Sequence, residues 1–270
     1  MLNIIPITNL LIPELSMYTS TTELQLMRYY EPSTGLFLVE SPNVIQRALE
    51  AGYKPVSFLV EKKYVSEELS PIFSMNISCP IFTADLSVLC NITGFSMTRG
   101  MLAIMKRNPL PSLSEISRDS KRVVVLERVM NPTNIGAIFR SAAALNMDAV
   151  LLTKGCSDPL YKRSSRVSMG SVFQIPWTFL PDSYLMDLKN HGYKLISMAL
   201  NNHSIAMNEL SLSSNDKIAI FMGTESDGLS DSTISASDYI VKIPMSHGVD
   251  SLNVAAASAI AFWELGQPLK

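Results

Sequence analysis

From residue 121 onward the chain repeats one pattern, a short apolar run followed by a turn and a segment with helical spacing of apolar residues. "RVVVLERV" opens this region, "NPTNIGAIFRSAAALNM" follows it, and "DAVLLT" is the next apolar run. The alternation continues through "YLMDLKNHGYKLISMAL", "KIAIFMG" and "YIVKIPM", and it ends in a helical pattern over 254–265. Strands that alternate with helices predict a parallel β-sheet covered on both faces, which is an α/β fold.

A smaller α/β region precedes this one. "GLFLVESPNVIQRALEAGYKPVSFLVE", residues 35–61, predicts a strand, a helix that stops at Gly52, and a second strand. "NPLPSLSEISRDS", residues 108–120, has two prolines, four serines and no apolar periodicity, so it is the best linker candidate. We therefore expect one α/β domain over residues 1–107, a linker over 108–120, and a second domain over 121–270.

Composition limits the class of protein. A hydrophobic content of 47% and a mean hydropathy of +0.20 predict a well-filled globular core. No apolar stretch approaches the roughly 18 residues needed to span a bilayer. The three cysteines, Cys79, Cys90 and Cys156, are far apart and not in CxxC spacing, which fits a reducing cytoplasm and argues against a zinc site. We expect a cytoplasmic protein that binds neither a membrane nor a metal.

Charge is distributed unevenly along the chain. The formal net charge is −2, yet residues 99–166 hold 12 Lys and Arg against 5 Asp and Glu, a formal charge of +7. A basic block between acidic segments can present a positive surface to a nucleic acid. Charge alone favours the other interpretation, a solvated face with ion pairs.

Three polar or glycine-rich loops follow predicted strands, at the edge where α/β sheets bind ligands. They are "NPTNIGAIFR", "GTESDGLS" (223–230) and "IPMSHGVDSLN" (243–253). None contains GxGxxG, and the P-loop-like spacing of Gly223 and Gly228 lacks the following lysine. Taken singly, the polar residues of these loops have ordinary interpretations as turn, surface or helix-capping residues.

Taken together and in this order, the three loops resemble the motifs of the SpoU (TrmH-type) RNA 2′-O-ribose methyltransferases of the SPOUT class. "NPTNIGAIFRSAAALNMDAVLL" is similar to the first motif, "IAIFMGTESDGLS" to the second, and "IPMSHGVDSLNVAAASAIAFWEL" to the third. The segment "SMGSVFQIPW" also resembles the family's connecting segment, so the likeness covers about 150 residues. The N-terminal part resembles, more loosely, an L30e-like substrate-binding domain. Asn131, Asn146 and Thr224 depart from the usual Asp, Gly and Asn of these motifs.

The resemblance implies a parallel-sheet SPOUT fold with a C-terminal deep trefoil knot, an exception to un-knotted topology. It implies S-adenosylmethionine as methyl donor, no metal, and a homodimer built through the knotted domain. In this interpretation the tripeptide 251–253 is part of the active-site wall rather than a helix cap. The residues that it would bring to the site are, for catalysis, Asn134, Arg140, Glu225, Ser251 and Asn253, and, for the cofactor, Leu200, Gly223, Ile243 and Leu252.

The basic block contains the first motif, and with the family in view it favours an RNA-backbone contact through Lys154, Lys162, Arg163 and Arg166. The extra N-terminal domain favours rRNA over tRNA by analogy. Arg140, which the family's proposal makes the base, is better suited to hold a phosphate and stabilise a forming alkoxide, because arginine stays protonated in proteins. The open alternatives are a tRNA 2′-O-methyltransferase, a base methyltransferase and a non-catalytic RNA-binding or ribosome assembly factor.

Overall fold

The computed structural model describes residues 2–8, 12–28, 35–65, 72, 75, 78–93, 100–201, 203–213, 216–224 and 227–266. It divides into two compact units. Unit 1 comprises Met1–Pro109 and Leu160–Phe173, and unit 2 comprises Leu110–Pro159 and Gln174–Lys270. Unit 1 breaks off after Pro109, two residues beyond the expected end of the first domain at residue 107. The segment Leu160–Phe173, which the sequence placed inside the second domain, belongs to unit 1.

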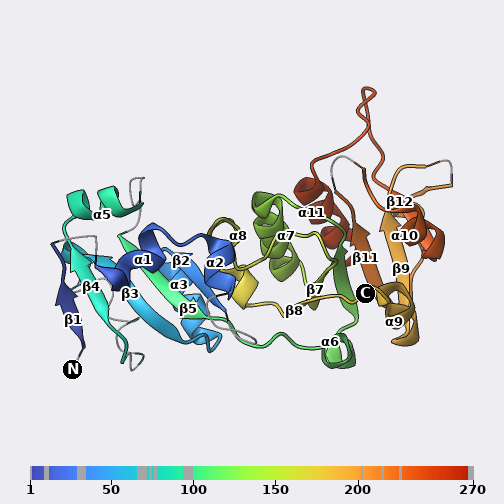
Figure 1. The fold of residues 1–270 in the computed structure, drawn as a ribbon. Coiled ribbons are helices and arrows are strands. Elements are labelled where there is room, and N and C mark those ends of the chain that lie inside the picture. The colour runs from blue at the N-terminus through green and yellow to red at the C-terminus, as the bar shows by residue number, and fades with distance from the viewer. Residues whose placement is uncertain are drawn as a thin grey trace. The chain divides into compact units, whose positions relative to one another are not determined.

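Unit 1 is built on a five-stranded sheet of order β1-β4-β3-β5-β2 (Figure 1). β3 is parallel to β4 and antiparallel to β5, and β2 is antiparallel to β5. The predicted strand, helix and strand over 35–61 are confirmed as β2, α3 and β3. The strands are β1 (Ile4–Pro6), β2 (Leu36–Glu40), β3 (Pro55–Glu61), β4 (Ile81–Ala84) and β5 (Met101–Lys106), and the α-helices are α1 (Ser16–Thr19), α2 (Glu23–Arg28), α3 (Pro42–Glu50), α5 (Leu86–Thr93) and α8 (Lys162–Val167).

Helix α8 belongs to unit 1 because its contacts are there. Arg166 pairs with the buried carboxylate of Glu40, with Nη1 and Oε2 3.2 Å apart. Arg47 donates a 2.6 Å hydrogen bond to the carbonyl of Met169. The ring centroids of Phe173 and Tyr53 lie 5.1 Å apart. These polar and aromatic contacts join residues more than a hundred positions apart, which local sequence patterns do not reveal.

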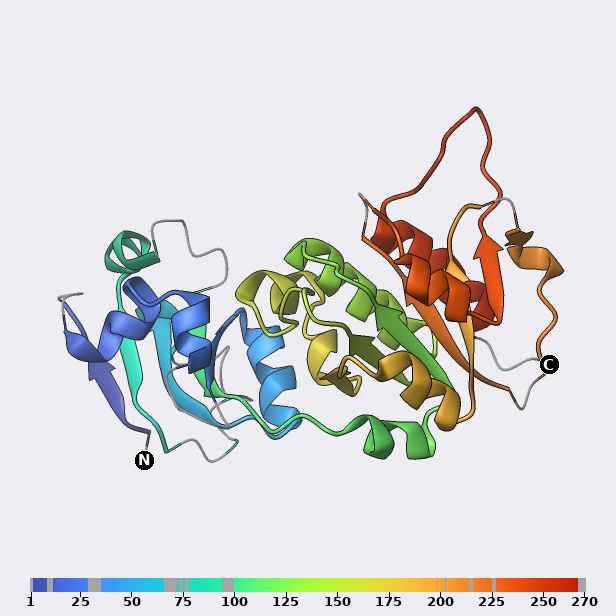
Figure 2. The same ribbon diagram turned by 45° about the vertical axis from the view of Figure 1, so that its right-hand side comes forward.

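Unit 2 is the predicted parallel α/β domain, a seven-stranded sheet of order β10-β12-β9-β11-β6-β7-β8 (Figures 1 and 2). Every neighbouring pair in it is parallel. The strands are β6 (Arg122–Leu126), β7 (Ala149–Leu152), β8 (Trp177–Phe179), β9 (Tyr193–Met198), β10 (Ile205–Ala206), β11 (Lys217–Met222) and β12 (Tyr239–Lys242), and the α-helices are α6 (Leu113–Asp119), α7 (Pro132–Ala144), α9 (Tyr184–Asn190), α10 (Asp231–Ala236) and α11 (Val254–Leu265).

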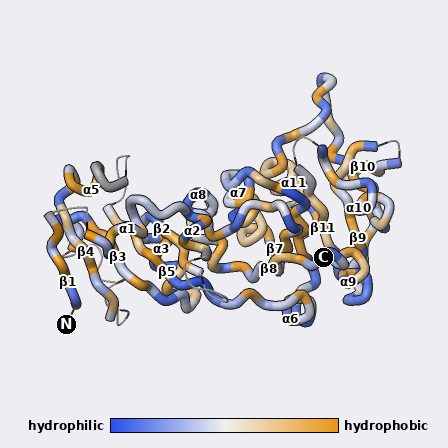
Figure 3. Tube along the Cα trace, in the orientation of Figure 1, coloured by the Kyte–Doolittle hydropathy of each residue, from blue (hydrophilic) through white to orange (hydrophobic). Residues whose placement is uncertain are grey.

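The central strands of unit 2 are apolar, as their colour in Figure 3 shows, and their buried side chains form its core. Side chains alternate between the faces of a strand. Val123 and Val125 pack in a cluster with residues of α6 and α9, while the helices α7 and α11 pack against each other. The central strands β6, β7 and β11 are buried almost throughout, which explains the continuous apolar runs in the sequence.

The segment predicted to be a linker is partly helical. Helix α6 begins with a capping box, in which Ser112 accepts a hydrogen bond from the backbone N–H of Glu115 while the Glu115 carboxylate accepts from that of Ser112. The S-x-x-E pattern is a helix-start signal that outweighed the prolines and serines around it. Within the described ranges, no helix is both long and apolar enough to cross a membrane.

Candidate active site at the carboxyl edge of the parallel sheet

The first motif forms the turn after β6 and the helix α7. Asn131 caps the helix by accepting a 2.9 Å hydrogen bond from the backbone N–H of Thr133, and Pro132 occupies the first turn. Asn134 is buried on the first turn of α7. The capped start of the helix therefore fixes Asn134 beside the carboxyl end of the sheet.

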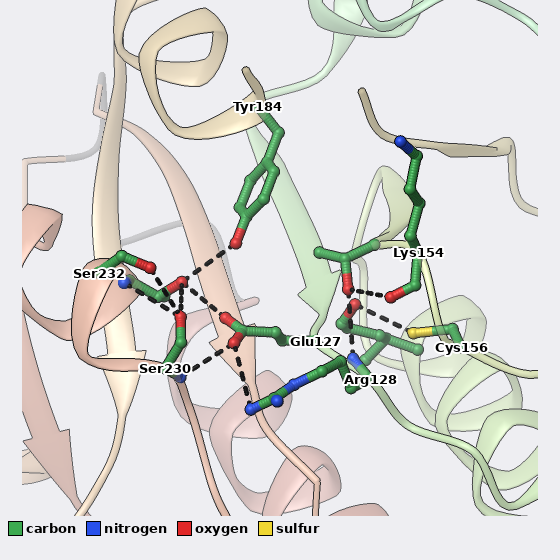
Figure 4. Close-up of polar contacts among 10 residues, drawn as sticks. Glu127, Arg128, Lys154, Cys156, Tyr184, Ser230 and Ser232 are labelled. Carbon is green, nitrogen blue, oxygen red and sulfur yellow. Dashed lines mark hydrogen bonds and ion pairs between the residues drawn. The ribbon is translucent and has the colours of Figure 1, made fainter. Parts of the chain in front are cut away.

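A buried carboxylate at the end of β6, just before the first motif, joins this strand to the second motif (Figure 4). Glu127 follows β6, and its carboxylate accepts a 2.9 Å bond from the backbone N–H of Ser230 and a 2.6 Å bond from the hydroxyl of Thr233. The hydroxyls of Tyr184 and Thr233 lie 3.1 Å apart, and burial raises the pKa of Tyr184. These contacts hold the start of α10 against β6 and thereby fix one end of the loop 223–230.

The loop 223–230 makes a tight turn at its start. A Cβ on Gly223 would lie 2.3 Å from the carbonyl carbon of Gly228, so no other residue fits there without displacing the backbone. The backbone N–H of Gly228 donates a 3.0 Å bond to the carbonyl of Thr224. The predicted catalytic residue Glu225 lies outside the described residues.

The third motif connects β12 to α11. In Figure 1 this connection, residues 243–253, runs out from the sheet before it returns to the helix. Because β12 lies beyond β9 in the sheet whereas α11 packs on α7, the connection must cross the carboxyl side of β9 and β11. That is a path compatible with a C-terminal knot, and the knot itself stays a prediction.

Asn253 has two roles in this structure. It caps α11 by accepting a 3.0 Å bond from the backbone N–H of Ala255, so the expectation that this tripeptide is not a helix cap is wrong. Its amide nitrogen also donates a 3.3 Å bond to Oδ1 of Asn134. Its side-chain oxygen accepts the capping bond, and its side-chain nitrogen donates the bond to Asn134. The Asn253 amide therefore links the third motif to the first.

These loops enclose a cavity of about 530 Å³ at the carboxyl ends of β9, β11 and β12. The four residues predicted to bind the cofactor, Leu200, Gly223, Ile243 and Leu252, all line it, as do Ser251 and Asn253. Apolar side chains from the strand ends, Met198, Met222 and Val241, line it too. Asp227, Lys242 and Asp250 add charged groups.

The remaining predicted residues lie elsewhere. Arg140 is exposed on α7 and is not among the residues that line the cavity. Of the predicted RNA-binding residues, only Lys154 lies in unit 2, where it pairs with Asp182 at 2.7 Å. Lys162, Arg163 and Arg166 lie on α8 in unit 1, and the backbone N–H of Lys162 donates to the carboxylate of Glu23.

Sequence reasoning missed Glu127 and the residues that contact it. The signal was present, since an acidic residue directly after the buried run "RVVVL" has to find hydrogen-bond partners where the strand ends. The partners themselves are a hundred residues away in the second motif, and only the fold brings them together.

Comparison with known proteins agrees with the motifs. Residues 121–263 match the model of the SpoU rRNA Methylase family. An uncharacterized tRNA/rRNA methyltransferase of Mycobacterium bovis is 37% identical over 232 residues, which are 85% of this chain and 80% of that protein. The 23S rRNA (guanosine(2553)-2′-O)-methyltransferase RlmP of Bacillus subtilis is 27% identical, over 86% of this chain and 89% of its own.

The fold has a solved counterpart. The AdoMet-bound rRNA methyltransferase from Sinorhizobium meliloti superposes with a TM-score of 0.82 at 22% identity, covering 97% of each chain. The family model covers more than half of this chain and the mycobacterial relative most of it. This chain therefore belongs to the SpoU rRNA methylase family, as the motifs predicted.

Proposed function

We propose that this protein transfers a methyl group from S-adenosylmethionine to the 2′-hydroxyl of a ribose in structured RNA, with rRNA favoured over tRNA. The observation that carries the proposal is the cavity in which the second and third motif loops meet, tied to the first motif by the hydrogen bond between Asn253 and Asn134. Family membership and the 2′-O-methyltransferase name of the Bacillus relative support the reaction type.

The cavity suits the methyl donor in size and chemistry. Its volume of about 530 Å³ lies within the roughly 300–1,000 Å³ typical of small-ligand sites. The apolar side chains of Leu200, Ile243 and Leu252 can contact an adenine ring, and the charges of Asp227 and Lys242 can pair with amino and carboxylate groups. S-adenosylmethionine would supply an electrophilic methyl group on its sulfonium. Ser251 and Asn253 then lie where they can position the ribose.

The transfer forms a bond between the methyl carbon and the 2′-oxygen, breaks the sulfonium–methyl bond, and releases the hydroxyl proton. In our proposal Arg140 holds an adjacent phosphate and stabilises the developing negative charge, and the proton passes to a phosphate oxygen or to water. The exposure of Arg140 on α7 fits contact with RNA. Asn134 would orient the phosphate or Arg140, and Glu225 would brace the loops.

Substitution of Arg140 tests its role. Arg140→Ala should lower kcat by about 100-fold, the usual effect of removing one electrostatic stabiliser. Arg140→Lys should keep part of the activity, because it retains the charge and loses only the planar geometry. Single-turnover rates, with RNA affinity measured in parallel, separate chemistry from binding. An Arg140→Lys variant as inactive as Arg140→Ala, with RNA affinity unchanged, would contradict this role.

The reaction itself is tested with labelled S-adenosylmethionine and total RNA from a bacterium that lacks the gene. After digestion, a labelled 2′-O-methylnucleoside supports the proposal, and fractionation of the RNA separates rRNA from tRNA. A labelled base identifies a base methyltransferase. Absence of label despite RNA and cofactor binding would favour the non-catalytic assembly factor.

We also propose a homodimer through unit 2. The outer side of α11 carries Ala256, Ile260 and Trp263 at helical spacing, and Trp263 is 61% exposed. A second copy would cover this apolar stripe. Trp263→Glu should therefore shift the protein from dimer to monomer in sedimentation velocity, whereas Glu264→Gln on the same turn should not. A native protein that sediments as a monomer would exclude the dimer.

Unit 1, with Lys162, Arg163 and Arg166 on α8, would contact the same RNA. Its likeness to an L30e-like substrate-binding domain supports this part of the proposal. An enzyme of rRNA acts where ribosomes are assembled, and this supports the cytoplasm as its compartment.

A further inference from the structure

Arg128 has an unusual backbone at the carboxyl edge of the sheet in unit 2. Its φ is +54°, in the left-handed region that residues with a Cβ disfavour. It lies two residues after the end of β6 and three residues before Asn131, where the first motif begins. Its backbone N–H donates a 3.2 Å bond to the hydroxyl of Thr153, and the preceding N–H, of Glu127, donates a 2.9 Å bond to the carbonyl of Met222. Both neighbouring strands therefore hold the strained residue in place.

The side chain that this backbone directs outward is poorly paired. It is 47% exposed, and its nearest anion is Oε1 of Glu127, at 3.9 Å from Nη2. That distance is too long for a hydrogen bond. The same oxygen already accepts the N–H of Ser230, and the other oxygen accepts the hydroxyl of Thr233. Within the described part of the chain, the guanidinium donors of Arg128 have no hydrogen-bond acceptor.

The position of this guanidinium relates it to the cavity. Ser230, which contacts the same carboxylate oxygen, directly follows Gly228 and Leu229 in the cavity lining. Lys154 stands at the end of the adjacent strand β7, and Figure 4 shows both cations at this edge. The only ion pair of Lys154 among the described residues is with Asp182, and both side chains are exposed. The ends of β6 and β7, at the same edge of the sheet as the cavity, therefore each carry an exposed cation.

We propose that Arg128 binds a backbone phosphate of the RNA substrate at this edge of the sheet. The planar fork of an arginine suits the bidentate geometry of a phosphate, and strain retained at a charged, exposed residue points to a ligand. A purely structural role as counter-ion of Glu127 would not need the left-handed backbone, because the carboxylate is already hydrogen-bonded twice. The inference rests on the proposed function in one respect, which is that the protein binds RNA.

Arg128→Gly tests the proposal cleanly, because glycine adopts a φ of +54° without strain while it removes the guanidinium. The probe is purified 16S and 23S rRNA from a bacterium lacking the gene, and Kd is measured between 50 and 300 mM KCl. We expect binding about tenfold weaker at 100 mM KCl, and a plot of log Kd against log salt shallower by about 0.7 to 0.9, the contribution of one phosphate contact. The temperature of unfolding and the affinity for S-adenosylmethionine should not fall.

Two further variants complete the test. Lys189→Ala removes one exposed charge from α9 and should leave both the affinity and the slope unchanged. Arg128→Lys should bind with intermediate affinity and the native slope, because its charge remains. An Arg128→Gly protein with the native Kd and slope overturns the proposal, and so does one whose only defect is a lower unfolding temperature.

Failure of the inference is distinguishable from failure of the proposed function. Suppose that the native protein transfers no methyl group, but that its plot of log Kd against log salt for rRNA becomes shallower in Arg128→Gly. That result would support the phosphate contact and contradict the proposed reaction. Methyl transfer by the native protein, together with an unchanged salt dependence of Kd in Arg128→Gly, would support the proposed reaction and contradict the phosphate contact.

Discussion

Two sides of the cavity are built in opposite ways. On one side, the loop 223–230 ends in the buried hydrogen bonds of Glu127 with Ser230 and Thr233. On the other side, all residues from Pro244 to Asn253 are exposed, and the turn is closed by one 3.2 Å bond from the N–H of Val249 to the carbonyl of Ser246. The first side is held by buried hydrogen bonds, whereas the second side carries the exposed apolar side chains of Met245 and Leu252, which a bound molecule can cover. Substitutions on the first side should therefore change stability, and those on the second should change affinity.

The largest effect is expected at Glu127. Glu127→Ala leaves the N–H of Ser230 and the hydroxyl of Thr233 without their acceptor in a buried place, and each such loss costs about 1–3 kcal/mol. We expect the free energy of unfolding in urea to fall by about 3 kcal/mol. Asp182→Ala, which breaks only the exposed pair with Lys154, should change it by less than about 0.5 kcal/mol.

Glu127→Gln sharpens this result, because the amide keeps one acceptor oxygen and the shape of the side chain. Its loss of stability should lie between the native protein and Glu127→Ala. If Glu127→Ala unfolds at the same urea midpoint as the native protein, the hydrogen bonds of Glu127 do not stabilise this side of the cavity. The proposed difference between the two sides would then be wrong.

An intermediate effect, on affinity alone, is expected at Leu252. This side chain lines the cavity and is 37% exposed, so a bound molecule can remove more of it from water. Leu252→Ala should weaken the binding of S-adenosylmethionine by about tenfold, which corresponds to roughly 1.4 kcal/mol of lost apolar contact. The unfolding free energy without ligand should stay within about 0.5 kcal/mol of the native value.

Val249 provides the matched control for Leu252. It lies in the same connection, is exposed and does not line the cavity. Isothermal titration calorimetry should give the native affinity for Val249→Ala. Equal weakening by the two substitutions would show that the whole connection, rather than the cavity-lining residue, controls binding.

The same contrast explains what the sequence could predict. Apolar runs and helical spacing are local, so the parallel sheet and the helical segment after β6 followed from the residues themselves. The motifs also placed Leu200, Gly223, Ile243 and Leu252, which all line one cavity. The contacts of Glu127 and of α8 join distant segments, and no local pattern encodes them. Helix α6 was missed for another reason, because the prolines and serines of residues 108–120 were interpreted as a linker although the S-x-x-E pattern at Ser112 starts a helix.

The smallest effect is expected at the tip of the exposed connection. His247 and Gly248 have φ of +58° and +71°, and the bond from Val249 to Ser246 closes a two-residue turn around them. Such turns need positive φ at both central residues, which suits glycine and costs other residues about 1 kcal/mol. Gly248→Ala should therefore disturb the connection slightly and raise the Kd for S-adenosylmethionine by about twofold, without changing global stability.

His247→Gly tests the same turn, and here we expect the Kd for S-adenosylmethionine to stay the same or to fall. Glycine removes the strain that His247 bears, so this variant should bind at least as tightly as the native protein, although the freer unbound chain offsets part of the gain. Calorimetry on the two variants, with urea unfolding in parallel, measures both quantities. Loss of global stability in Gly248→Ala would mean that the connection is part of the folded core, and the distinction between the two sides of the cavity would then disappear.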